Sequence, residues 1–444
     1  MKRSVVAILL AVVLLLTLAV PCSAAGKKNG PPPSHIKWPV ELHGTLNNAE
    51  YEILVPADWN GTLLVYAHGY TPVLLPAEAL PDITIGGVDA KDLLLNEGYA
   101  LAGTANKAGG WAVKEGIQNN LALTNYFKGK VGNPERVILL GFSMGSAIAL
   151  ESIEKYPGIY DGAITGGSLG AGTPMNFDLS LGFSLAYDVA FDWMESWGSV
   201  GDVRDDLNFE TDVLPILLFQ AAADPAYFDK IEFIRLVCDF PEDVYDIEGM
   251  FDPYSWFFTD MFYATQVRAE LESRAGAPVA QNLDQVYSLD EGEVDYLVGY
   301  LGMDPDNVAN MLDEMKSRKI SASIPARKYA EHYATFTGNL KHPVITIQTR
   351  LDEVVREANE GIYHDLVEAA GKGDFLVQVF TDSIGHCNFS GWQLLRVLTA
   401  MEFWLDNGIR PEPDDTTFFP PFAPFPPYEG FIPGFMLLPW PFSP

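Results

Sequence analysis

Positively charged side chains are scarce in this 444-residue chain, which carries 28 lysines and arginines against 59 aspartates and glutamates. The formal net charge of −31 argues against nucleic acid and anionic membrane surfaces as partners, because both are themselves negatively charged. A disordered chain is also excluded, since 48% of the residues are hydrophobic and can form a large core.

Cysteine is scarce as well, with only Cys22, Cys238 and Cys387 in the chain. They form no C-x-x-C pair and no metal-type cluster, so the sequence predicts no metal site and no organic cofactor. Cys22 falls in a segment that we expect to be removed. In an exported protein, Cys238 and Cys387 could form one disulfide or remain two separate thiols.

A nearly continuous hydrophobic run, Val5 to Val20, lies close to the N-terminus. Lys2 and Arg3 precede it, and Ser23-Ala24-Ala25 resembles a small-residue cleavage site. Residues 1–25 are therefore predicted to be a signal peptide, and the mature protein to be secreted to the periplasm or the extracellular space. A retained anchor is the alternative, but the run is short for a span, so no stable membrane span is expected.

The remaining chain divides by its pattern of apolar residues. Residues 26–38 read as a linker, and strand-like and helix-like segments alternate through 39–167 and again through 336–409, which predicts an α/β fold with a mostly parallel sheet flanked by helices. Between them, 168–335 has few strand-like runs and many aromatic, helix-like segments, which predicts a large helical cap or lid inserted into the sheet domain. Residues 410–444 form a tail rich in proline and phenylalanine, whose aromatics could pack on the domain or on a partner.

A G-x-S-x-G motif stands at Gly141-Phe142-Ser143-Met144-Gly145. The apolar residues 137–140 before it predict a buried strand, and residues from 146 onward predict a helix. This strand–turn–helix context is that of a nucleophile elbow, in which a strained turn exposes the serine hydroxyl and requires small residues on both sides. Ser143 is therefore the predicted nucleophile; the alternative is a serine that merely caps the helix.

A serine nucleophile needs an adjacent base, and the base needs a group that orients it. His386 and Asp352 each follow a predicted strand, and the order Ser143, Asp352, His386 is the one expected for this fold. We predict that His386 is the base and Asp352 its orienting acid. Glu353 and Asp382 compete with Asp352 for that role.

The oxyanion of an acyl-transfer reaction needs two backbone donors. Met144, directly after the nucleophile, is predicted to supply one N–H, and Tyr70, in the loop after an earlier strand, the other. His68 in that loop is predicted to hold it by a hydrogen bond rather than to act as the base. Trp111 could line the substrate site, with core packing as an equal alternative.

Five segments carry a family resemblance: Tyr66-Ala67-His68-Gly69-Tyr70, Gly98-Tyr99-Ala100, Gly110-Trp111-Ala112-Val113, Gly141-Phe142-Ser143-Met144-Gly145 and Gly385-His386-Cys387-Asn388-Phe389. They resemble motifs of the secreted α/β-hydrolase superfamily of serine esterases and lipases, and the resemblance implies the triad and oxyanion roles given above.

Two subfamilies are partly similar to this chain. Tannase and feruloyl esterase proteins also carry a cysteine after the histidine, but they pair it with a cysteine where this chain has Phe142. Cutinase-like polyester hydrolases have a similar oxyanion loop and elbow, here Gly69-Tyr70-Thr71 and Ser143-Met144-Gly145, but they lack a large cap.

Together these patterns predict a secreted serine hydrolase that cleaves carboxylic esters through an acyl-enzyme. The partner would be a small-molecule or polymeric ester, and the sequence carries no signal for an oligomeric state. The aromatic cap suggests an apolar or aromatic substrate, although the core of the cap would explain the same residues. A serine peptidase on the same fold and a non-catalytic binding protein are the alternatives.

Overall fold

The structure, a computed structural model, describes residues 39–73, 78–80, 84–85, 88–106, 109–240, 255–413 and 417–419. The predicted signal peptide and linker, and most of the predicted tail, lie outside these residues. Within the described ranges, no helix combines the length and the apolar character needed to cross a membrane.

The described chain forms two compact units. One is Thr173–His332, and the other consists of the described residues before and after it, through Gly172 and from Tyr333. A Cβ placed at Gly172 would lie 2.6 Å from the carbonyl oxygen of Ala334, so the chain leaves and re-enters the second unit at neighbouring points. The sequence placed these boundaries at 168 and 335.

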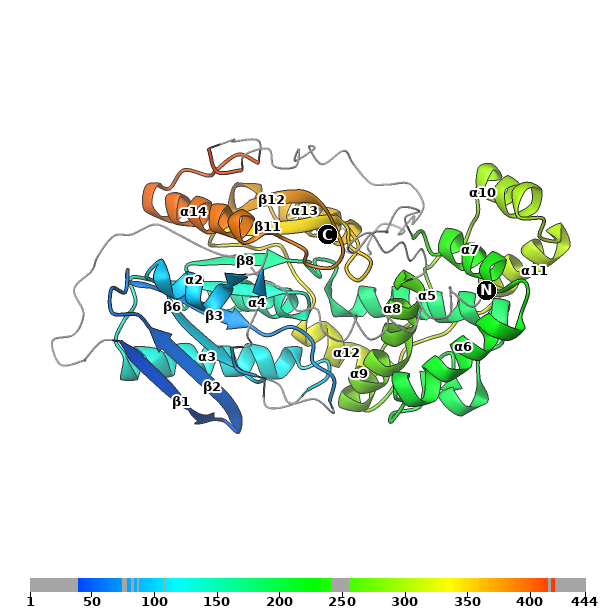
Figure 1. The fold of residues 1–444 in the computed structure, drawn as a ribbon, viewed down its shortest axis with the longest axis horizontal. Helices are drawn as coiled ribbons and strands as arrows, with labels where there is room; N and C mark the ends of the chain where they lie inside the picture. Colours follow the sequence, from blue (N-terminus) through cyan, green and yellow to red (C-terminus); the bar gives the residue numbers. More distant parts are fainter. Residues whose placement is uncertain are drawn as a thin grey trace. The chain divides into compact units, whose positions relative to one another are not determined.

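An eight-stranded sheet forms the second unit, here called the sheet unit (Figure 1). Its strands are β1 (Val40–Leu46), β2 (Ala49–Val55), β3 (Thr62–Ala67), β6 (Ala100–Thr104), β7 (Arg136–Phe142), β8 (Gly162–Gly166), β11 (Val344–Leu351) and β12 (Leu376–Ile384). They lie in the order β1-β2-β6-β3-β7-β8-β11-β12, and all run in the same direction except β2, which is antiparallel to both β1 and β6. This strand order, with parallel crossovers through helices, is that of the α/β-hydrolase fold, as predicted.

The sheet opens with a two-residue hairpin between β1 and β2. Asn47 and Asn48 form the turn with φ of 52° and 64°, and Leu46 pairs with Ala49 across it. Asparagine tolerates positive φ better than most residues, and two such residues in succession give the hairpin the twist of its strands.

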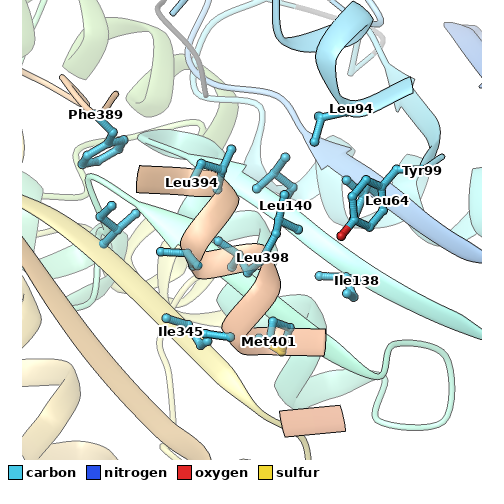
Figure 2. Close-up of a cluster of buried hydrophobic side chains, with 14 of the residues drawn as sticks. Leu64, Leu94, Tyr99, Ile138, Leu140, Ile345, Phe389, Leu394, Leu398 and Met401 are labelled. Atoms are coloured by element: carbon cyan, nitrogen blue, oxygen red, sulfur yellow. The ribbon is translucent and has the colours of Figure 1, made fainter. Parts of the chain in front are cut away.

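Helices cover both faces of the sheet. They are α2 (Ala90–Asn96), α3 (Val113–Lys130), α4 (Met144–Lys155), α13 (Ala358–Ala369) and α14 (Gly391–Asn407). On one face, α2 and α14 pack on the apolar side chains of the central strands, with Leu394, Leu398 and Met401 of α14 at the centre of the cluster (Figure 2). Phe389, three residues after His386, belongs to the same cluster, so the core anchors the segment that carries the predicted base.

The inserted unit is mainly helical. Its helices are α5 (Gly172–Phe191), α6 (Leu214–Ala223), α7 (Tyr227–Val237), α8 (Ser255–Phe262), α9 (Arg268–Ala275), α10 (Glu291–Asp295), α11 (Pro305–Ser317) and α12 (Ile324–Tyr333), with a small pair of strands, β9 (Gly198–Ser199) and β10 (Asp202–Val203). Many of its large aromatic residues are buried against one another; Phe183, Trp197 and Trp256, for example, have no exposed surface. They form the core of this unit, so their abundance is no evidence for an aromatic substrate.

The first residues of the predicted tail pack on the sheet unit. The ring of Phe418 lies 4.9 Å from that of Phe403 on α14, and Phe419 is buried in the core cluster. The guanidinium of Arg410 donates two hydrogen bonds to the carbonyl oxygen of Leu376. The sequence predicted that the tail aromatics pack either on the domain or on a partner, and Phe418 and Phe419 pack on the domain.

Candidate active site

Ser143 stands in the turn between β7 and α4. Its φ of 55° and ψ of −129° lie in a region that non-glycine residues rarely adopt and that costs about 1–3 kcal/mol. The chain bears this strain because both ends of the turn are fixed, by a buried central strand and by a buried helix. The result is the predicted elbow, with Ser143 immediately before the helix N-terminus.

The glycines on either side of Ser143 are required by close backbone contacts. A Cβ at Gly141 would overlap the carbonyl oxygen of Gly145, and a Cβ at Gly145 would overlap that of Ala67. The prediction that small residues must flank Ser143 is confirmed. The contact with Ala67 also brings the end of β3 against the start of α4.

Asp352 and His386 form an ion pair beyond the ends of β11 and β12. The Nδ1 atom of His386 lies 2.8 Å and 3.0 Å from the two carboxylate oxygens of Asp352. A carboxylate can only accept, so Nδ1 carries a proton, and in the neutral ring Nε2 keeps its lone pair. The histidine is thus held in the tautomer that can accept a proton from a hydroxyl.

The backbone of its own turn fixes the carboxylate of Asp352. The N–H groups of Val354 and Val355 donate to Oδ1 over 2.9 Å and 2.8 Å, and the residue is only 2% exposed. Of the two predicted competitors, Glu353 is buried next to Asp352, and the side chain of Asp382 lies outside the described atoms.

The charges around His386 favour its protonated form. Burial lowers the pKa of the imidazole. The charge of Asp352, the interaction with the sulfur of Cys387 and the hydrogen bonds to both raise it by more, so the pKa lies well above the ordinary 6.5. A base must be neutral to accept a proton. Activity that depends on His386 should therefore require a pH above this raised pKa.

We expect kcat/KM for a simple ester to rise with pH along an acid limb whose midpoint lies above 6.5. Substituting Cys387→Ala removes one of the groups that raise the pKa of His386, so this limb should move to lower pH. The measurement is the pH profile of p-nitrophenyl acetate hydrolysis. Cys238→Ala, in the inserted unit, is the matched control and should leave the midpoint of the acid limb unchanged. The same midpoint in both variants would contradict the prediction.

Glu353 is a second buried carboxyl beside the ion pair. It is 8% exposed, and its Oε2 atom has no hydrogen-bond partner among the described residues. Burial and the neighbouring charge of Asp352 raise the pKa of Glu353 to about 7. The folded protein therefore holds Glu353 protonated at pH values where the unfolded chain releases the proton.

This raised pKa makes the folded state less stable as pH increases. Below about pH 4.5 both states hold the proton; between 4.5 and about 7 the unfolded state loses it first, so the free energy of unfolding falls by up to about 3 kcal/mol. Urea unfolding at pH 5, 6, 7 and 8 should show the decline. Glu353→Gln resembles the protonated acid, so its free energy of unfolding should change less with pH across this range and exceed that of wild type at pH 8. Parallel curves of unfolding free energy against pH for the two proteins would refute the assignment.

The loop after β3 lies against the start of α4. Within it, the Nδ1 atom of His68 lies 2.8 Å from the carbonyl oxygen of Gly69, which confirms that His68 holds the loop by a hydrogen bond. Burial lowers the pKa of His68, which favours the neutral ring. Nδ1 donates this bond because a carbonyl oxygen can only accept. Met144 is the first residue of α4, where backbone N–H groups have no partner within the helix. The donor roles of Tyr70 and Met144 stay predictions.

Trp111 is connected to the same loop. It is 3% exposed, and the neighbouring Gly110 donates its N–H to the carbonyl oxygen of Thr71 over 2.6 Å. Burial to this degree is what core packing gives. A contact between Trp111 and substrate stays a prediction.

Cys387 and Cys238 are both free cysteines in this structure, and the disulfide considered from the sequence stays a prediction. Cys387, with φ of 52°, places its Sγ atom 3.6 Å from Nε2 of His386 and 3.6 Å from the carbonyl oxygen of Gly166. A Cβ at Gly167 would lie 2.5 Å from Sγ and 2.9 Å from Cε1 of His386. The thiol thus packs the imidazole against the chain that follows β8, a contact the sequence did not predict.

Metal ligands are not grouped in the described part of the chain: no three histidine, cysteine, aspartate or glutamate side chains there are placed to hold an ion. The arrangement instead combines a strained serine on an elbow, a histidine held by a carboxylate, and a loop packed over the helix N-terminus. Together with the strand order, this is the architecture of an α/β-hydrolase with a serine, histidine and aspartate at the ends of its strands.

Comparisons with known proteins give distant likenesses. No family model matches the chain. A curated relative, the o-phthalyl amidase of Xanthobacter agilis, is 26% identical over 144 residues, which are 32% of this chain and 29% of the amidase. The chain thus matches less than a third of the length of that relative.

Solved structures of similar fold include an esterase from Aspergillus oryzae (15% identity, 84% of this chain and 80% of that one, TM-score 0.39). Feruloyl esterase B from the same organism is 14% identical, with 88% and 86% of the chains covered and a TM-score of 0.41. The acylaminoacyl peptidase of Pyrococcus horikoshii is 11% identical, with 82% and 41% covered and a TM-score of 0.38. Likenesses this distant say nothing about substrate, and the fold assignment rests on the strand order.

Proposed function

We propose that this protein is a serine hydrolase that cleaves carboxylic esters through an acyl-enzyme. The observation that carries the proposal is the ion pair between His386 and Asp352, at the same strand ends as the strained elbow of Ser143. A structural histidine would not need a buried carboxylate, and a structural serine would not need a strained backbone.

In the proposed reaction, Nε2 of His386 takes the hydroxyl proton of Ser143 as the oxygen attacks the ester carbonyl. Asp352 stabilises the imidazolium that forms. The N–H groups of Met144 and Tyr70 would bind the oxyanion, and the helix N-terminus of α4 favours the same negative charge. His386 then protonates the leaving alcohol and later activates the water that releases the acid.

Two measurements test the proposal together. A fluorophosphonate probe should label the protein, and mass spectrometry should locate the label on the peptide that contains Ser143. A p-nitrophenyl ester series from acetate to palmitate should be hydrolysed, and its chain-length profile would separate a short-acyl esterase from a lipase or polyester hydrolase. Absence of both labelling and hydrolysis would reject the enzyme and favour the binding protein.

Amide hydrolysis is a second candidate, and the likeness to the o-phthalyl amidase favours it. The same acyl-enzyme chemistry cleaves an amide when the histidine can protonate a leaving amine. p-Nitrophenyl butyrate and butyryl p-nitroanilide share an acyl group, so the ratio of their kcat/KM values compares cleavage of an ester with cleavage of an amide directly. A ratio near one would place the activity with amidases and peptidases rather than esterases.

Secretion and a covering role for the inserted unit also belong to this proposal. The charged, apolar and small-residue segments of residues 1–25 support export, and the N-terminal mass of protein collected outside the cytoplasm tests it. The unit Thr173–His332 follows closely after β8, which supports a cap that controls access to the site. A cap would make KM depend on acyl size more strongly than kcat.

A further inference from the structure

The segment Gly166–Leu169, here called the β8 loop, contacts all three segments that carry the proposed triad. The carbonyl oxygen of Gly166 accepts a hydrogen bond from the backbone N–H of Ser143 over 2.9 Å. Gly167, with φ of 54°, lies against the ring of His386 so closely that a Cβ would displace it. The nucleophile and the base are therefore both packed on one short piece of backbone.

Ser146 joins this loop to the nucleophile. Its hydroxyl is fully buried; it donates to the carbonyl oxygen of Ser143 over 2.6 Å and accepts from the N–H of Leu169 over 2.9 Å. One hydroxyl thus bridges the elbow and the far end of the β8 loop. Because both partners are backbone atoms, the bridge fixes main-chain positions rather than rotamers.

Gln348 joins the same loop to the acid. Its side chain is fully buried on β11, with Oε1 accepting from the N–H of Ser168 over 3.1 Å and Nε2 donating to the carbonyl oxygen of Val355 over 2.8 Å. The N–H of Val355 in turn donates to Oδ1 of Asp352. A continuous chain of hydrogen bonds therefore runs from the β8 loop, through Gln348, to the carboxylate that holds His386.

We propose that Gln348, together with Ser146, acts as a positioning residue that uses the β8 loop to set the distance between the nucleophile and the histidine–aspartate pair. The proposal rests on the proposed function, because it assigns these residues a role in that reaction. Triad chemistry is sensitive to such placement, since an error of about 1 Å can cost about 100-fold in rate. A buried amide with both its ends bonded to different loops is suited to hold that distance.

The main test is Gln348→Met, which keeps the side-chain volume and removes its hydrogen bonds to Ser168 and Val355, together with a third to the carbonyl oxygen of Thr349. The matched control is Gln378→Met on the neighbouring strand β12, where Nε2 donates to the backbone carbonyl and the carboxylate of Glu360 on α13. We expect kcat for p-nitrophenyl butyrate to fall by about 10- to 100-fold in Gln348→Met with KM within about threefold. Gln378→Met should lose unfolding free energy while keeping kcat within about twofold of wild type.

Ser146→Ala provides a second, smaller change in case Gln348→Met does not fold, and we expect a similar fall in kcat. Wild-type kcat in a folded Ser146→Ala or Gln348→Met overturns the inference, as does an equal fall in Gln378→Met. Ser143→Ala, measured on the same ester, distinguishes failure of the proposed function from failure of the positioning inference alone. If it keeps the wild-type rate, the proposed function fails and this inference with it; if it loses the rate while the positioning variants keep theirs, only the inference fails.

Discussion

Replacing Ser143 with alanine should lower kcat for ester hydrolysis by about 10⁴- to 10⁶-fold, because the acyl-enzyme of the proposed reaction forms on its hydroxyl. KM should change little, since a serine hydroxyl adds little to ground-state binding. The assay is steady-state hydrolysis of the best p-nitrophenyl ester, at enzyme concentrations high enough to measure the residual rate. Ser152→Ala is the matched control: Ser152 is also fully buried on α4, and its hydroxyl has no partner among the described residues.

The same experiment extends to His386, because residues that act as a unit give non-additive losses. His386→Ala should cost about as much as Ser143→Ala, and the double variant no more than either single one. Additive losses would mean that the two side chains act in separate steps. A rate within tenfold of wild type in Ser143→Ala would refute the serine mechanism.

Much of the site was predictable because its signals are local. The elbow needs a buried strand, small flanking residues and a helix start, and all of these lie within a few positions of Ser143. Asp352 and His386 follow from a similar argument, because the carboxyl ends of parallel strands meet at one edge of the sheet. A residue directly after such a strand is placed there by topology alone.

The connections between these residues were not predictable from sequence. Ser168 and Gln348 are 180 positions apart, and their hydrogen bond exists only because β8 and β11 are neighbours in the sheet. A glutamine in an apolar strand carries no signal for which backbone groups it will meet. The same holds for Cys387, whose thiol contact with Gly166 depends on the packing of two loops.

The aromatic residues of the inserted unit show how composition can mislead. Tryptophan and phenylalanine are abundant there, and a substrate site and a hydrophobic core both need them. A unit built mainly of helices has to fill its own interior, and large rings do so with few residues. Burial decides between the two uses, and Trp197 and Trp256 are fully buried.

Gly145→Ala should destabilise the protein by about 3 kcal/mol or more and abolish activity. The new Cβ would overlap the carbonyl oxygen of Ala67, a backbone atom at the end of a central strand that cannot move aside without breaking the sheet. Relief would require the loop of Tyr70 to shift away from α4, which would also separate the two predicted oxyanion donors. Urea unfolding measures the loss of stability, and fluorophosphonate labelling measures the fraction of protein that keeps a reactive Ser143.

Gly129→Ala is the control that isolates this steric effect. Gly129 lies in α3, and a Cβ there would meet nothing within 4 Å, so alanine should raise the free energy of unfolding by about 0.5–1 kcal/mol through its helix propensity. Both glycines are helical, and alanine is favoured over glycine in either helix. Opposite signs for the two substitutions would therefore come from the contact with Ala67, whereas a stable, active Gly145→Ala would mean that the β3 loop does not pack on the elbow.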